Sequence, residues 1–229
     1  MPLNQRKQRL PSIDVALLDM DGTLLDLNYD DTFWNHFLPE ALAQRQGMTS
    51  HAASQHVEAT LSSMRGTLAW YDIEHWSRIF EIEILALKAE YAGSIEYRPG
   101  SMEFLKSLKS RGITTLLATN AHPDLIDLKI AALEAKALPF TEFFNEILSS
   151  HQIGEPKESP HYWRAIQEAL AFDPNRALFV DDNLDVLRTA QNFGIAHCIA
   201  VNQPDLSQPI RDIRDFPSVT RLNEIEVDR

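Results

Sequence analysis

Cysteine is almost absent from this chain of 229 residues, which contains only Cys198. A single cysteine cannot form an internal disulfide, so a disulfide-stapled scaffold is excluded. Cys198 stands in the apolar run from Ile195 to Val201, and we expect it to be a buried core thiol. The fold must therefore depend on a hydrophobic core, for which 44% hydrophobic residues and this length are sufficient.

Long apolar segments are also lacking near the start of the chain. Residues 1–10 are basic and polar, and the first hydrophobic run, Val15 to Leu18, is interrupted at once by Asp19. A signal peptide and a membrane span both need a longer apolar stretch. We therefore expect no membrane partner and a cytoplasmic location.

Basic residues are the minority charge, with 21 Lys and Arg against 33 Asp and Glu, for a formal net charge of −12. Surfaces that bind nucleic acid or anionic lipid usually have the opposite balance. We expect no nucleic-acid partner and a small molecule as the ligand. The composition leaves open whether the chain is a monomer or a homodimer.

Short apolar segments recur along the chain with helix-like stretches between them. Near-continuous apolar runs of this length are typical of strands that are buried on both faces of a parallel sheet. Gly112 and Gly194 stand where a helix would end before the next strand. The sequence therefore predicts an α/β fold, a three-layer doubly wound parallel sheet with right-handed crossovers. The predicted strands are residues 13–18, 113–118, 145–149, 177–180 and 195–201.

Residues 28–97 break this alternation, because they are far more than one crossover helix needs. Apolar residues such as Trp76 and Phe80 recur there with helical spacing, and no convincing strand is present. We predict an all-helical cap at residues 28–97, serving as a substrate lid. The α/β core then consists of residues 1–27 and 98–229.

The tail after Val201 is polar and contains several prolines. We predict that it wraps the surface of the core. A short helix is expected around residues 219–225.

Polar motifs follow four of the predicted strands. In open parallel sheets the active site lies beyond the carboxyl ends of the strands, so these motifs should meet at one edge. They would bring together four carboxylates, a lysine, a hydroxyl and an amide: Asp19, Asp21, Thr119, Asn120, Lys157, Asp181 and Asp182.

The four carboxylates indicate a metal site. Carboxylates a few ångströms apart repel each other by roughly 4 kcal/mol per pair at an effective dielectric constant near 20, so the cluster needs a cation. Asp19, Asp21, Asp181 and Asp182 offer only oxygen ligands, which favours Mg²⁺ over zinc, since zinc prefers histidine and cysteine. A metal, a lysine and a hydroxyl around a carboxylate describe a site for a phosphate dianion.

The spacing within the first motif also has a chemical meaning. Asp19 can attack phosphorus and form an acyl phosphate, and Asp21 can protonate the leaving oxygen and later activate water. Thr119 and Asn120 can donate hydrogen bonds to phosphate oxygens. Lys157 can balance the charge that builds in the transition state.

These motifs resemble those of the haloacid dehalogenase superfamily of phosphohydrolases. Residues 18–25 (LDMDGTLL), Thr119, Lys157 and residues 181–182 (DD) occur in the family's order, each after a predicted strand. The resemblance implies an Mg²⁺-dependent phosphatase with a phospho-aspartate on Asp19. It further implies that Asp19, the backbone carbonyl of Asp21 and the two acids Asp181 and Asp182 hold the metal, with Asp182 favoured as a direct ligand and Asp181 direct or through water. The insertion resembles the superfamily's helical cap of the first type.

A closer resemblance, which spans cap and core, is to the bacterial GMP/IMP nucleotidases. It rests on residues 24–27 (LLDL) with 33–34 (FW), 68–71 (LAWY), 119–123 (TNAHP) and 154–158 (GEPKE). It implies a 5′-nucleotidase for purine monophosphates.

One departure concerns the fourth motif. The family often has another acid four residues beyond the metal ligand, where Val186 stands after Asp182. Asp185 has that spacing from Asp181, so the sequence leaves the register of this motif open.

Other reactions would use the same core residues. A sugar-phosphate or phosphoglycolate phosphatase shares the chemistry, and a β-phosphoglucomutase would transfer the phosphoryl group from the aspartate to a second hydroxyl. Cap aromatics such as Trp34, Trp70 and Trp76 could stack on a purine, which is worth about 1–3 kcal/mol per base. A small lid also needs large apolar side chains for its own packing, and this second role is open for each of them.

Overall fold

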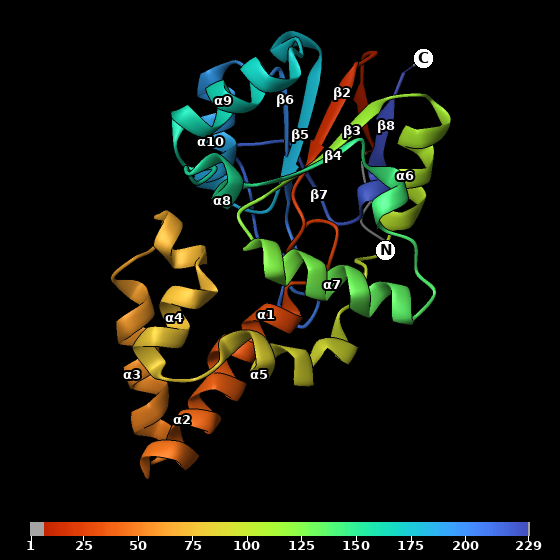
Figure 1. Ribbon diagram of the computed structural model, residues 1–229. Helices are drawn as coiled ribbons and strands as arrows, with labels where there is room; N and C mark the ends of the chain where they lie inside the picture. The colour runs from red at the N-terminus through yellow and green to blue at the C-terminus, as the bar shows by residue number, and fades with distance from the viewer. Residues whose placement is uncertain (1–6, 229) are drawn as a thin grey trace.

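The central sheet of the computed structural model, which describes residues 7–228, has six parallel strands (Figure 1). They are β2 (Val15–Leu18), β3 (Thr114–Thr119), β4 (Glu146–Ser149), β5 (Ala177–Asp181), β6 (His197–Val201) and β7 (Ser218–Val219). The order across the sheet is β4-β3-β2-β5-β6-β7, so the first of these strands lies in the interior and later ones are added on both sides. The predicted doubly wound parallel sheet is confirmed, and each predicted strand is present with bounds shifted by two residues or fewer.

A second, two-stranded parallel sheet joins the two ends of the described chain. In it β1 (Gln8–Leu10) pairs with β8 (Ile225–Val227). The short helix expected around residues 219–225 is present only as a 3₁₀ turn at Leu222–Glu224, which lies between the end of β7 and the start of β8. Ile225 and Val227 are buried, whereas Glu226 between them forms ion pairs with Lys7 and Arg9. Such alternation with a period of two belongs to a strand.

Four helices cover the two faces of the central sheet. α6 (Ser101–Ser110) and α7 (Pro123–Ala135) pack on one face, and α9 (Pro160–Leu170) and α10 (Leu184–Phe193) pack on the other, while the short helix α8 (Ser150–Ile153) directly follows β4. Side chains of β2 alternate between the two layers: Ala16 and Leu18 join the first cluster, and Val15 and Leu17 join the second. All four are buried, which explains the continuous apolar run in the sequence. Cys198 is buried and unpaired, as expected.

Residues 28–97, which we call the inserted segment, contribute the helices that lie beyond the sheet in Figure 1. These are α1 (Asn28–Thr32), α2 (Leu38–Gln46), α3 (Ser50–Ser62), α4 (Ile73–Phe80) and α5 (Ile84–Glu90), with a π-helical turn at Phe33–Phe37 and 3₁₀ turns at Leu68–Tyr71 and Ala92–Ser94.

The inserted segment has an apolar cluster of its own, which includes the stacked rings of Trp76 and Phe80. Leu125 of α7 belongs to the same cluster, so α7 contacts both the sheet and the inserted segment. The division into a core and a separate cap domain stays a prediction, and residues 1–6 and 229 of the predicted core lie outside the described residues. Within the described range, every helix is too short or too polar to cross a lipid bilayer.

Candidate active site

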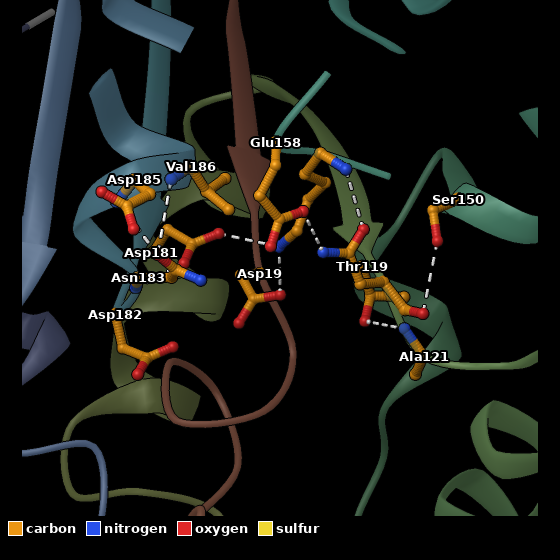
Figure 2. Close-up of polar contacts among 12 residues, drawn as sticks. Asp19, Thr119, Ala121, Ser150, Glu158, Asp181, Asp182, Asn183, Asp185 and Val186 are labelled. Atoms are coloured by element: carbon orange, nitrogen blue, oxygen red, sulfur yellow. Dashed lines mark hydrogen bonds and ion pairs between the residues drawn. The ribbon is translucent and has the colours of Figure 1, made fainter. Parts of the chain in front are cut away.

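The polar motifs that follow the strands meet at one edge of the sheet. Figure 2 shows Asp19 after β2, Thr119 at the end of β3, and Asp181 with Asp182 at the end of β5, gathered around one space. A cavity of about 470 Å³ opens there. Its lining includes all seven residues that the sequence predicts for the site: Asp19, Asp21, Thr119, Asn120, Lys157, Asp181 and Asp182.

Lys157 lies between two of the carboxylates at the floor of this cavity. Its Nζ is 2.5 Å from Asp19 Oδ1 and 2.7 Å from Asp181 Oδ2. Its backbone is held on both sides, because its N–H donates to Asn120 Oδ1 at 2.9 Å and its carbonyl accepts from Trp163 Nε1 at 2.8 Å. Burial lowers the pKa of Lys157, but the charges of Asp181 and Asp19 outweigh this effect and raise it well above its usual value. Lys157 is therefore a fixed, charged group.

The acidic cluster contains more negative charge than Lys157 balances. Carboxylate oxygens of Asp19, Asp181 and Asp182 lie within 4.8 Å of one another. Burial raises the pKa of Asp19 to about 7, although Lys157 opposes the shift, and burial together with the charges of Asp181 and Asp19 raises the pKa of Asp182 well above its usual value. Such shifts mean that burial and mutual repulsion disfavour the ionised carboxylates by more than Lys157 stabilises them. Three clustered oxygen ligands with excess negative charge fit a hard divalent cation.

Asp181 and Asp182 are adjacent but have different surroundings. Both oxygens of Asp181 accept hydrogen bonds, Oδ1 from the backbone N–H of Asn183 at 2.7 Å and Oδ2 from Lys157. Asp182 is less enclosed, with 18% of its side chain exposed and Arg211 of the tail 3.9 Å away. The carboxylate of Asp182 is thus the more available of the two for a metal ion.

The structure also resolves the register of the fourth motif. Asn183 caps α10, because its Oδ1 accepts from the backbone N–H groups of Asp185 at 2.9 Å and Val186 at 3.4 Å. The side chain of Asp185 is 80% exposed and forms an ion pair with Arg188. Figure 2 shows Asp185 on the far side of Asp181 from Asp19. The acids that face the cavity are therefore Asp181 and Asp182, and Val186 lies buried beside them.

Asp21 faces the cavity from the turn after β2, and its partner comes from α7. Lys129 Nζ lies 2.6 Å from Asp21 Oδ1 and 2.7 Å from Asp30 Oδ2, and Lys88 Nζ lies 2.6 Å from Asp30 Oδ1. Burial raises the pKa of Asp21 to about 6, with the positive charge of Lys129 opposing the shift and the negative charge of Asp30 adding to it. Four alternating charges therefore run from the first motif into the inserted segment.

Thr119 and Asn120 have different surroundings from each other. Thr119 Oγ1 accepts from the backbone N–H of Ala121 at 3.1 Å, which leaves its own O–H free to donate to a ligand. Asn120 Nδ2 donates to Glu158 Oε2 at 3.0 Å, while its Oδ1 accepts from Lys157. The side chain of Asn120, which the sequence predicts to bind phosphate, is thus largely engaged in holding its neighbours.

A comparison with known proteins identifies the family. The profile of the haloacid dehalogenase-like hydrolases matches residues 13–194. The chain belongs to this family of hydrolases. Among curated relatives, it is 34% identical over 207 residues to the GMP/IMP nucleotidase YrfG of Escherichia coli (strain K12), which covers 90% of this chain and 91% of the relative. It is 27% identical over 199 residues to Protein CbbY of Cereibacter sphaeroides, covering 82% and 83% of the two chains.

Solved structures share the fold of this hydrolase. The HAD phosphatase from Thermococcus onnurineus superposes with a TM-score of 0.75 over 93% of this chain and 95% of that chain, at 18% sequence identity. Such a low identity establishes the fold alone. The predicted superfamily resemblance is confirmed by the family match and the YrfG relative.

The turn after β2 packs directly against the acidic cluster of the hydrolase. Gly22 has a left-handed backbone with φ of +79°, and its N–H donates to the carbonyl of Leu25 at 2.8 Å. A Cβ atom at Gly22 would lie 2.8 Å from Asp182 Cγ and 2.9 Å from Pro204 Cβ. Only glycine has both the backbone freedom and the small size that this position requires.

The wall of the cavity is largely apolar and comes mainly from the inserted segment. Trp76 is fully buried among the inserted helices, so it is a packing residue and offers no face to a ligand. Tyr71 donates from its hydroxyl to Glu158 Oε1 at 2.6 Å, which links the wall to the floor. The wall residues are Trp34, Leu61, Trp70, Tyr71, Ile73 and Leu125.

Sequence analysis missed the partners of Asp21. Lys129 stands four residues after Leu125 and four before Leu133, and all three are buried. Lys88 stands four residues after Ile84, and both are buried. For both lysines, the signal in the sequence was a charged residue at helical spacing from apolar residues. Nothing in the sequence around Asp30 distinguishes it from surface acids.

A Gly22→Ala substitution should weaken cation binding. The new methyl group would displace Asp182 or the turn, and we expect the affinity of the hydrolase for Mg²⁺ to fall by about tenfold or more, as for other disruptions around metal ligands. Isothermal titration calorimetry measures this affinity, with circular dichroism to confirm folding.

Gly47→Ala is the matched control, because Gly47 also has a positive φ (+66°), but a Cβ atom there would meet no other atom within 4 Å. It should leave Mg²⁺ affinity unchanged. Equal affinities for the Gly22→Ala variant and the wild type would contradict the close packing on Asp182.

Divalent cations should stabilise the hydrolase more at neutral than at acidic pH. The pKa of Asp19 rises from 3.8 to about 7 on folding, so in metal-free protein the stabilising contribution of this group is complete below about pH 4 and is lost as the pH rises through 7. A cation needs the ionised carboxylates and reverses this loss. The increase in Tm on adding Mg²⁺, measured by differential scanning calorimetry, should be larger at about pH 7.5 than at about pH 5. An equal or smaller increase at the higher pH would count against a cation site at Asp19.

Proposed function

We propose that this chain is an Mg²⁺-dependent phosphatase that hydrolyses phosphomonoesters through an aspartyl-phosphate on Asp19. The observation that carries the proposal is the arrangement at the cavity floor. One carboxylate, Asp19, is held at one oxygen by the fixed cation Lys157, beside an acidic cluster that has unbalanced negative charge. This arrangement supports a nucleophile that is oriented for attack on a bound phosphoryl group.

Mg²⁺ would be held by the carboxylates of Asp19 and Asp182 and, by family resemblance, by the backbone carbonyl of Asp21. Asp181 has both oxygens engaged with Lys157 and Asn183, which favours an indirect contribution to the metal site. When bound, Mg²⁺ supplies positive charge that offsets repulsion between the substrate phosphate and the carboxylates.

The reaction has two steps that this chain's residues can perform. In the first step Asp19 attacks phosphorus, the bond from phosphorus to the leaving oxygen breaks, and Asp21 gives that oxygen a proton. Thr119 and Lys157 donate to the phosphoryl oxygens as charge builds on them. In the second step Asp21 takes a proton from a water molecule that attacks phosphorus, and the bond between Asp19 and phosphorus breaks to release inorganic phosphate.

As the substrate we propose a purine nucleoside 5′-monophosphate. The named activity of the YrfG relative, which aligns over 90% of this chain, supports this assignment. The cavity supports it as well, because a charged floor suits a phosphate and the wall includes the aromatic rings of Trp34 and Trp70. Its volume of about 470 Å³ is within the usual range for small-molecule sites.

Phosphate release with Mg²⁺ across a panel of phosphomonoesters tests the substrate. We expect GMP and IMP to be hydrolysed with higher kcat/KM than AMP, pyrimidine monophosphates and sugar phosphates. Comparable or better rates on sugar phosphates would leave the phosphatase chemistry in place and remove the nucleotidase assignment. Isomerisation of a sugar phosphate without net phosphate release would indicate a phosphomutase.

A Trp70→Leu variant separates recognition of the base from recognition of the phosphate. If a purine stacks on this ring, loss of about 1–3 kcal/mol should raise KM for GMP roughly 5- to 150-fold. Ribose 5-phosphate, which has no base, is the matched control substrate and should keep its KM. Equal changes with both substrates would show that Trp70 only packs the wall.

A further inference from the structure

A chain of four charges, of which the two lysines are buried, connects the polar edge of the sheet with the inserted segment. It runs from Asp21 in the turn after β2 to Lys129 on α7, then to Asp30 on α1 and Lys88 on α5. The three links between a lysine Nζ and a carboxylate oxygen measure 2.6, 2.7 and 2.6 Å in that order. Figure 1 shows α7 lying between the sheet and helices α1 and α5, which is the position that such a connection requires.

The lysines of this chain have almost no contact with solvent. The exposed fraction is 0% for the Lys88 side chain and 2% for Lys129, and Asp30 is only 16% exposed. Burying charged groups is costly, and apolar side chains of similar volume often stabilise a fold as well or better. A role in stability alone therefore does not readily explain why two lysines are buried at this place.

The outer end of the chain is rigidly placed. Lys88 Nζ lies 4.3 Å from the ring centroid of Phe33 and 4.8 Å from that of Tyr29, and the Tyr29 hydroxyl donates to the Lys88 carbonyl at 2.9 Å. These aromatic contacts favour the ammonium group at this position. Asp30 is thereby held between two lysines that come from different parts of the molecule.

The inner end of the chain constrains which oxygen of Asp21 can hold a proton. A lysine ammonium group donates hydrogen bonds and cannot accept one. Because the ammonium group of Lys129 lies 2.6 Å from Oδ1 of Asp21, it holds negative charge on that oxygen, and a proton on this carboxyl group is favoured on Oδ2. A general acid must carry its proton on the oxygen that faces the leaving group, so this contact would favour the productive arrangement with Oδ2 toward the leaving group.

We propose that Lys129 and Asp30 are positioning residues for acid catalysis by Asp21. Lys129 fixes Oδ1 and leaves Oδ2 to deliver the proton, and Asp30 fixes Lys129 from the inserted segment. Protonation of the leaving group thus depends on how the inserted helices sit on the sheet. This inference rests on the proposed phosphatase function, but on no particular choice of substrate.

The test uses the dependence of kcat/KM on the leaving group. This parameter covers the steps up to transfer of the phosphoryl group to Asp19. p-Nitrophenolate leaves without needing a proton, whereas an alkyl alkoxide, such as the 5′ oxygen of a nucleoside, needs one. For Lys129→Met we expect kcat/KM to fall by about 10²-fold with alkyl phosphates, the usual contribution of a general acid, and by less than about threefold with p-nitrophenyl phosphate.

Related variants locate the effect. Asp30→Asn should show the same selectivity with a smaller loss, and Lys129→Arg should recover part of the alkyl-phosphate activity, because arginine also only donates. In an Asp21→Asn background, Lys129→Met should cause no further selective loss, as expected for residues that act through one another. Lys109→Met, which removes an exposed ion pair with Glu142 at 3.2 Å, is the matched control and should change neither rate.

Each possible result of these rate comparisons either supports the inference or overturns it. An equal loss with both classes of substrate would show that Lys129 only joins the two parts of the fold, and it would overturn the inference, as would no loss with either class. If Lys129→Met does not fold, as judged by near-ultraviolet circular dichroism, Lys129→Arg and Asp30→Asn provide the same comparison. A wild-type protein that hydrolyses no phosphomonoester would overturn the proposed function itself, and the inference with it.

Discussion

The ammonium group of Lys157, 2.5 Å from Asp19 and 2.7 Å from Asp181, is the contact on which the rest of the site depends. Without it, two buried carboxylates would face each other with no positive charge between them, at a high cost in free energy. Asn120 and Trp163 hold the backbone of Lys157 so that its side chain reaches this point. One lysine cannot balance the whole acidic cluster, and this remaining negative charge is the physical reason for expecting a divalent cation.

The inserted segment contributes more to the site than an apolar wall. It reaches the floor of the cavity through two polar connections, Asp30 with Lys129 near Asp21 and Tyr71 with Glu158 near Lys157. Because Lys129 lies on α7 and Glu158 lies in the turn before α9, the position of the inserted helices is coupled to two separate groups at the floor. The substrate space and the reactive groups are thus arranged by the same packing of helices on the sheet.

The sheet and the floor could be predicted from the sequence because their signals are local. Each of the seven predicted site residues lies at the end of an apolar strand or a short distance beyond it. The site could therefore be predicted without knowing the order of the strands across the sheet. The edge strand β7 was missed because it has only two residues, and β8 was missed although Ile225 and Val227 alternate with polar neighbours. Lys129 and Asp30 were missed because their contact joins positions 99 residues apart, which only the packing of the inserted helices brings together.

The central claim is that Asp19 carries the phosphoryl group, and trapping the acyl phosphate tests it most directly. Protein turning over p-nitrophenyl phosphate with Mg²⁺ is quenched in acid and reduced with borohydride, which converts a phosphorylated aspartate to homoserine. Peptide mass spectrometry then locates the converted residue, and its fragment ions distinguish Asp19 from Asp21. We predict homoserine at position 19, and none in a sample quenched without substrate. Conversion at another acid, or rapid turnover with no converted residue, would contradict the account.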